Sequence, residues 1–160
     1  MSASTQYKMS FAYLASIIIA NIGFTYLPMI VLPGGYALAP MSFLVGFVFV
    51  LRDYAQQELK HWVLAIMAAG VAASYFLASP YVAAASAIAF AISELADWAV
   101  YTWTKRPLRQ RVLISSAIST PIDSAVFMLI LGFFSLPGLL IMTSSKMVGA
   151  LLVWFWAGRK

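Results

Sequence analysis

The sequence predicts an all-α integral membrane protein with six transmembrane helices and both termini in the cytoplasm. Hydrophobic residues make up 63% of the 160 residues and charged residues only 9%, whereas soluble domains are about half apolar and one-quarter charged. The apolar residues form six runs, each close to the roughly 20 residues that a spanning helix needs. Nine of the ten basic residues lie outside the middle of these runs, on alternate connections.

The six runs use most of the chain, so we expect one transmembrane domain over residues 1–160 and no soluble appendage. Backbone groups in lipid must bond internally, which makes each run a helix. The first run follows Lys8 in the manner of a signal peptide, but five further runs favour a retained helix. The predicted helices are 9–28, 38–55, 62–78, 81–103, 112–134 and 136–157.

The charges of the connections predict the orientation of the helices. Basic residues precede the first helix and follow the second, fourth and sixth, while the other three connections carry no charge. Cytoplasmic loops of membrane proteins carry an excess of Lys and Arg, so both termini are predicted to be cytoplasmic. The nine basic residues are Lys8, Arg52, Lys60, Lys105, Arg106, Arg109, Arg111, Arg159 and Lys160.

Small residues are concentrated in two segments, 65–74 and 82–86. Small side chains let helix backbones approach closely where lipid supplies no hydrophobic drive for association. We therefore expect the third and fourth helices to form the packed centre of the bundle.

Composition excludes several classes of function. The chain has no cysteine, which removes disulfides and thiolate chemistry, and the single histidine, His61, leaves little for zinc or haem ligation. We expect no cofactor and no metal. The net charge of +5 could indicate a nucleic-acid partner, but basic residues placed between apolar runs contact lipid headgroups instead, so we expect none.

One basic residue, Lys146, has no topological explanation because it lies about halfway along the last helix. A charge at that depth costs between about 2.5 and 10 kcal/mol, so polar groups there should face one another or a watery cavity. A lysine–carboxylate pair that only fixes helix packing is one interpretation. A polar substrate site is the other, because the acidic residues outnumber the lysine. The residues at comparable depth are Asn21, Glu94, Asp97 and Asp123.

Aromatic side chains share predicted helix faces with these carboxylates. Trp98 and Tyr101 follow Glu94 at i+4 and i+7, and Phe127 follows Asp123 at i+4. Rings stack on a planar heterocycle while a carboxylate accepts two parallel hydrogen bonds from its edge, although ordinary packing also explains the rings. The pattern favours a site for a small planar heterocyclic substrate.

The end of the second helix carries Arg52 and Asp53. This pair is either a topology-setting arginine beside an acid or part of a cytoplasmic gate. The residues that follow, Glu58, Lys60 and His61, are expected in a solvated loop.

Three motifs in this order resemble the VUT family of vitamin-uptake and queuosine-precursor transporters: Leu51-Arg52-Asp53-Tyr54, Ile92-Ser93-Glu94-Leu95-Ala96-Asp97 and Ser119-Thr120-Pro121-Ile122-Asp123-Ser124. The resemblance runs from the second helix onward. It implies a six-helix protein of the bacterial inner membrane that imports 7-deazaguanines such as 7-cyano-7-deazaguanine. It also implies that Asp97, Asp123 and Lys146 take the family's polar positions, with Arg52 and Asp53 in the second-helix motif. The chain departs from the family pattern near Glu58, where the acidic residue and Glu–x–Tyr–Gly stretch of many members are only partly present.

We therefore predict a secondary transporter rather than an enzyme, with Asp123 or Glu94 reading the base edge and Lys146 keeping these carboxylates ionised. One alternative is a substrate-binding subunit of an energy-coupled vitamin importer. Another is an intramembrane enzyme that uses Glu94 and Asp97, one helical turn apart, but no catalytic signature supports it. The coupling to protons or ions stays open, as does the oligomeric state, a homodimer included.

Overall fold

The protein is a bundle of long helices in a computed structural model that describes residues 7–34, 36–77 and 80–157. Within that part of the chain a short 3-10 turn, Lys60–Trp62, joins the second and third long helices. The predicted cytoplasmic residues Arg159 and Lys160 lie outside the described residues. The long helices are α2 (Lys8–Tyr26), α3 (Met41–Leu59), α4 (Val63–Leu77), α5 (Pro80–Trp103), α6 (Leu108–Leu131) and α7 (Leu136–Ala157).

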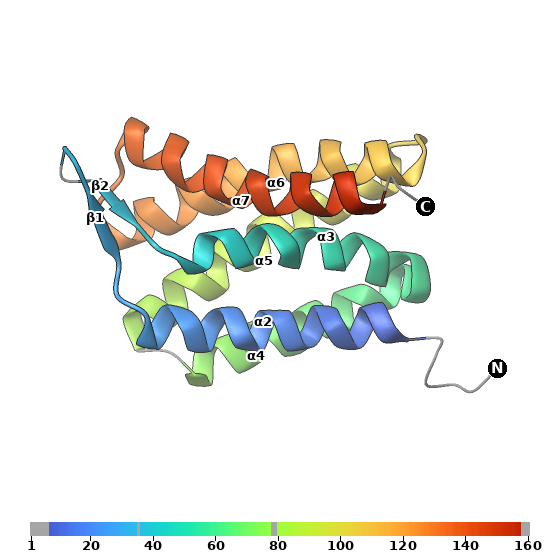
Figure 1. Cartoon of the computed structure of the whole chain (residues 1–160). Coiled ribbons are helices and arrows are strands. Elements are labelled where there is room, and N and C mark those ends of the chain that lie inside the picture. Colours follow the sequence, from blue (N-terminus) through green and yellow to red (C-terminus); the bar gives the residue numbers. More distant parts are fainter. Residues whose placement is uncertain (1–6, 35, 78–79, 158–160) are drawn as a thin grey trace.

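Each helix packs mainly against two neighbours, so the bundle closes into a ring in the order α2, α3, α7, α6, α5, α4 and back to α2, and α3 also contacts α4, α5 and α6. Successive helices alternate in direction, and α2 begins at the same end of the bundle at which α7 ends (Figure 1). We call this the terminal end, and the opposite end, which carries the two strands, the hairpin end. The cytoplasmic orientation of the terminal end stays a prediction.

The length and apolarity of the helices identify a membrane protein. Among the described residues, four helical stretches are long and apolar enough to cross a membrane, and a shorter apolar stretch covers 136–152. One of the four, Met41–Leu77, contains both α3 and α4. Helix α4 alone has 15 residues, about 22 Å at 1.5 Å per residue, which is shorter than the ~30 Å hydrocarbon core. Six separate spans therefore stay a prediction.

The first connection differs from the expected simple turn. Strand β1 (Ile30–Leu32) pairs antiparallel with β2 (Tyr36–Leu38), so the fold contains a short hairpin besides its helices. Gly34 has a φ of 97°, a left-handed conformation that glycine adopts without steric cost. Residues 38–40, predicted as the start of the second helix, precede α3.

Several helix ends also differ from the predicted positions, among them the start of α6, which begins at Leu108 and not at residue 112. Helix α6 stops at Leu131, three residues early, because Gly132 takes a φ of 76° and its N–H bonds back to the last carbonyls of the helix. Helix α3 continues to Leu59, beyond the predicted end at residue 55. The extension carries Glu58, which therefore lies on a helix and not in a loop.

The expectation that the third helix packs at the centre is wrong. Of the α4 side chains that the structure describes, only Val63 and Gly70 are buried. A close helix contact joins α3 to α7, where a Cβ on Gly46 would lie 1.9 Å from the carbonyl oxygen of Lys146. A Cβ on Gly149 would lie 2.6 Å from the carbonyl of Phe43. Single glycines opposite a backbone, and not a run of alanines, therefore bring the central helices together.

Candidate functional site

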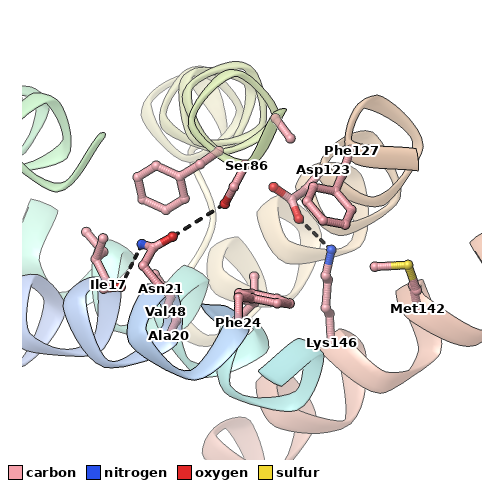
Figure 2. Close-up of a pocket in the computed structure, with 13 residues that line it drawn as sticks. Ile17, Ala20, Asn21, Phe24, Val48, Ser86, Asp123, Phe127, Met142 and Lys146 are labelled. Carbon is pink, nitrogen blue, oxygen red and sulfur yellow. Dashed lines mark hydrogen bonds and ion pairs between the residues drawn. The ribbon is translucent and has the colours of Figure 1, made fainter. Parts of the chain in front are cut away.

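A cavity lies inside the ring, in the half of the bundle nearer the hairpin end. Its volume is about 30 Å³, room for about two water molecules, so the helices must move apart before it can hold a larger molecule. Its wall comes from five helices, and Figure 2 shows its polar side chains facing inward. The lining residues are Ile17, Ala20, Asn21, Phe24, Val45, Val48, Ser86, Ala89, Phe90, Asp123, Phe127, Met142 and Lys146.

The charged part of the cavity is a pair formed by Asp123 of α6 and Lys146 of α7 (Figure 2). The Lys146 Nζ donates to Asp123 Oδ2 at 2.5 Å and to Ser124 Oγ at 2.8 Å. The other carboxylate oxygen, Oδ1, accepts a bond from Ser93 Oγ of α5 at 3.1 Å. One ammonium and one carboxylate balance each other, so the pair can remain charged in a site largely removed from water.

Across the cavity, α2 and α5 contribute a neutral polar group. The Asn21 side-chain amide donates to the carbonyl of Ile17 at 2.8 Å, and Ser86 Oγ donates to Asn21 Oδ1 at 3.4 Å. These bonds fix which way the amide points, with its oxygen toward Ser86 (Figure 2). The rings of Phe24 and Phe127 lie 6.2 Å apart between centroids, tilted by 39°. The cavity therefore combines a charged pair, an oriented amide and two aromatic rings.

A second polar group, the Arg52 cluster, consists of Tyr13, Arg52, Asp53, Glu94 and Asp97. The Arg52 guanidinium contacts all three carboxylates: Nη1 lies 3.0 Å from Asp53 Oδ1, Nε lies 3.4 Å from Glu94 Oε2, and Nη2 forms an ion pair with Asp97. The Tyr13 hydroxyl donates to Glu94 Oε2 at 2.5 Å. Each of the five side chains is at most 1% exposed, so this cluster is closed to water.

Further hydrogen bonds hold the Arg52 cluster in place. Ser115 Oγ donates to Asp53 Oδ2 at 2.8 Å, and Ser119 Oγ donates to Asp97 Oδ1 at 3.4 Å. Arg52 Nη1 donates to Gln56 Oε1 at 2.6 Å. Helix α6 thus supplies two groups to the Arg52 cluster before it supplies Asp123 to the cavity.

The Arg52 cluster lies between the cavity and the terminal end. Along α3 the cavity residue Val48 comes one turn before Arg52, and along α5 the cavity residue Phe90 comes one turn before Glu94. Both helices run from the hairpin end toward the terminal end (Figure 1). The cluster therefore closes the cavity on the side of the terminal end.

The structure divides the predicted site residues into two groups. Asn21, Asp123, Phe127 and Lys146 line the cavity. The acidic residues Glu94 and Asp97 belong with Arg52 and Asp53 in the Arg52 cluster, so Lys146 pairs with Asp123 and not with Glu94. Asp97 comes seven residues after the cavity residue Phe90 on α5, which places it about 10.5 Å farther along the helix axis. Residues on one helix face can therefore lie at different depths.

Two predicted aromatic residues stand apart from the cavity. Trp98 packs edge-on against His61, with ring centroids 5.6 Å apart. Tyr101 lies near two guanidinium groups, with its ring centroid 6.0 Å from Arg52 Cζ and 4.7 Å from Arg111 Cζ. Tyr101 also lines a separate hollow at the terminal end, together with Gln56, Gln57, Lys60, His61, Thr102 and Arg111.

The structure separates the expectations for Arg52 and Glu58. Arg52, for which a topology-setting role and a place in a gate were both open, is buried, unlike an arginine that faces the cytoplasm. Glu58, expected in a solvated loop, accepts hydrogen bonds from the Met9 and Ser10 amides and from Ser10 Oγ at 2.6–3.0 Å. A carboxylate at the start of α2 satisfies amides that have no partner within the helix. Glu58 therefore ties the first turn of α2 to the last turn of α3.

Other site residues were not predicted at all. Tyr13 and Phe24 lie on the same face of α2 as Asn21, at helical spacings that could have shown them. Ser93 directly precedes Glu94, but no sequence pattern indicates that it bonds Asp123. Ser86 and Phe90 stand in an alanine-rich stretch without a distinguishing signal.

Comparison with known proteins gives one match. The model of a family described as "Putative vitamin uptake transporter" matches residues 7–157, which is nearly the whole chain. No curated protein and no solved structure matches. The match and the apolar helices together support a membrane transporter.

Proposed function

The chain belongs to this family of vitamin uptake transporters, and we propose that it imports a 7-deazaguanine precursor of queuosine, such as 7-cyano-7-deazaguanine. Transport would proceed by alternating access, in a bacterial inner membrane, with six helices crossing the bilayer and the terminal end in the cytoplasm. Exposed basic residues at the terminal end support this orientation: Lys8, Lys60, Lys105 and Arg106.

The observation that carries the substrate class is the Asp123–Lys146 pair inside the cavity. One edge of a deazaguanine presents a carbonyl acceptor beside an N–H and an amino donor. The pair offers the complementary order, an ammonium donor beside a carboxylate with two acceptor oxygens. Binding would replace the direct 2.5 Å contact between Lys146 and Asp123 with contacts from each to the base.

The walls of the cavity suit a flat ring system. Phe24 and Phe127 approach from α2 and α6 and offer aromatic faces for stacking. Asn21, held by Ile17 and Ser86, adds an oriented amide on the far side. The substrate is uncharged, so it leaves the charge balance of the Asp123–Lys146 pair unchanged.

Alternating access requires the closed side of the cavity to open. The Arg52 cluster joins α2, α3 and α5 through ion pairs and the Tyr13 bond, and these contacts would separate when the cavity opens toward the terminal end. In this proposal Arg52 and Asp53 act in the cytoplasmic gate.

Purified protein in liposomes tests the proposal. Wild-type protein should take up labelled 7-cyano-7-deazaguanine, and Asp123→Asn and Lys146→Met should lose binding and uptake. Phe155→Ala serves as the control because Phe155 is exposed near the end of α7, outside the cavity. Normal binding in both cavity variants would contradict the proposed site.

The same preparation separates an autonomous carrier from a substrate-binding subunit of an energy-coupled importer. Uptake by the pure protein indicates a carrier, whereas tight binding without uptake indicates a subunit that needs an ATPase partner. The proposal of alternating access by this chain alone fails in the second case.

A further inference from the structure

The Arg52 cluster contains more acidic than basic side chains. Asp53, Glu94 and Asp97 face a single guanidinium, and all four side chains are at most 1% exposed. If the three carboxyl groups were all ionised, the cluster would hold an excess of two negative charges away from water. Buried charges without a partner are avoided by taking up protons. The cluster therefore holds a proton in this closed conformation.

Two of the three carboxylates have a polar contact at each oxygen. Asp53 and Asp97 each accept from a serine at one oxygen and face Arg52 with the other. An ionised carboxylate has acceptors and no donor, so these contacts suit the ionised form of both groups. With both ionised, Arg52 balances only one of them, and a charge on Glu94 would raise the excess to two.

Glu94 is therefore the site for a proton. Its Oε2 accepts the Tyr13 hydroxyl and faces Arg52, but its Oε1 is buried and has no hydrogen-bond partner among the described residues. A bare carboxylate oxygen in such a place is costlier than a neutral carboxyl group. Protonation of Glu94 lowers the excess of the cluster from two negative charges to one.

The surroundings of Glu94 contain one basic group. Tyr13 faces it from α2, Arg52 and Asp53 from α3, and Asp97 from its own helix, while α4 has no charged residue. Asp123 of α6 is bonded to the neighbouring Ser93 and is paired with Lys146 of α7. Among these described contacts Arg52 alone offsets the negative charge of Glu94.

We propose that Glu94 takes up one proton on the outer side and releases it in the cytoplasm in each cycle, so that inward proton movement drives import of the base. This inference rests on the proposed function. The proton binds a carboxylate oxygen of Glu94 and leaves from the same group, and no other bond is made or broken.

Ser93 connects the proton site to the cavity. Its hydroxyl lies 3.1 Å from both Asp123 Oδ1 and the carbonyl of Phe90, and one hydroxyl proton serves one of these acceptors at a time. A base whose N–H groups occupy Asp123 displaces Ser93 toward the Phe90 carbonyl. Ser93 and Glu94 are successive residues of α5, so the cavity and the proton site meet on adjacent positions of one helix.

A polar path leads from the cluster toward the terminal end. Gln56 accepts from Arg52 Nη1 at 2.6 Å and donates to Thr102 Oγ1 at 2.9 Å. Both Gln56 and Thr102 line the hollow that contains His61 and Arg111. When the cluster opens, the released proton therefore has a hydrophilic exit.

The test compares net accumulation with exchange in liposomes whose interior is one pH unit more alkaline than the medium. Wild-type protein should accumulate labelled 7-cyano-7-deazaguanine up to about tenfold, the proton ratio for one pH unit, and should also exchange labelled for unlabelled base. Glu94→Gln, which cannot release a proton, should lose accumulation and keep exchange. The matched control Glu58→Gln, a carboxylate outside the cluster, should keep both.

Each result has a definite meaning. If wild-type protein exchanges the base but accumulates it to the same level with and without the pH gradient, proton coupling is overturned. The proposed function is then left standing. Accumulation by Glu94→Gln overturns the role of Glu94. Absence of exchange in wild-type protein overturns the proposed function and, with it, this inference.

A measurement on the wild-type protein covers the case in which Glu94→Gln does not fold. Calorimetric titration of the solubilised protein with 7-cyano-7-deazaguanine, in two buffers of different ionisation heat, counts the protons exchanged on binding. A count that changes between about zero and one as the pH is varied supports the inference. A count of zero at every pH overturns it.

Discussion

The Asp123–Lys146 pair of the cavity and the Arg52 cluster both place charged side chains inside the helix bundle. They differ in charge balance and in the empty space beside them. In the cavity one ammonium meets one carboxylate beside empty volume, and Asp123 retains 8% exposure. In the Arg52 cluster three carboxylates surround one guanidinium, and its side chains fill the interior. The cost of burying charge is therefore not enough to identify a binding site. Under the proposals above, the balanced pair beside the cavity binds the base, and the closed cluster with excess charge acts as the gate and the proton site.

The largest expected effect is on the free energy of unfolding, which should fall more when the Arg52 cluster is broken than when the Asp123–Lys146 pair is broken. Arg52→Met removes the guanidinium that faces three buried carboxylates, and breaking a buried ion pair from one side costs about 3–5 kcal/mol. Lys146→Met should cost less, because Asp123 lies beside the cavity and keeps its bond from Ser93. Thermal unfolding in detergent measures both variants. Equal losses would remove the distinction between the two groups.

Base affinity tests which group contacts the substrate. Asp123→Asn removes a charged acceptor and should weaken binding of 7-cyano-7-deazaguanine about 10- to 100-fold, the worth of one or two charge-assisted hydrogen bonds. Asp97→Asn, in the Arg52 cluster, should leave equilibrium binding within about twofold and slow net uptake. Calorimetry gives the affinities. If Asp97→Asn weakened binding as much as Asp123→Asn, the substrate would reach the cluster.

The aromatic rings should contribute a smaller part of the affinity. Phe24→Ala and Phe127→Ala each remove a stacking surface worth about 0.5–1.5 kcal/mol, or roughly two- to twelvefold in affinity. Phe155→Ala removes an exposed ring far along α7 and should have no effect on binding. Unchanged affinity in both cavity variants would show that these rings only pack against each other.

The smallest effect concerns a carboxylate that belongs to neither group. Glu58→Ala removes the acceptor for the first amides of α2 and should lower the free energy of unfolding by about 1 kcal/mol. Base affinity should not change, because Glu58 lies at the terminal end, away from the cavity. A loss of affinity together with stability would show that the first turn of α2 is coupled to the cavity.

The sequence alone determined the apolar helical architecture and the two most prominent cavity charges. Hydropathy and the alternation of basic connections follow from local composition, and Lys146 and Asp123 stand out because their depth in a helix can be counted. The resemblance to the transporter family, read from three short motifs, is confirmed over residues 7–157. Hydropathy, connection charge, residue depth and short motifs can each be read from one helix or connection without knowing how it packs against the others.

The tertiary structure decided which helix faces meet. The spacing along α5 put Glu94 near the middle of its helix, but only packing showed that its partners are Tyr13 and Arg52 and not Lys146. Contacts between α3 and α7 at Gly46 and Gly149 set the position of Lys146, and no periodicity within one helix specifies such a contact. Helical geometry fixes direction and depth within an element, whereas the pairing of charges between elements depends on how the helices pack together.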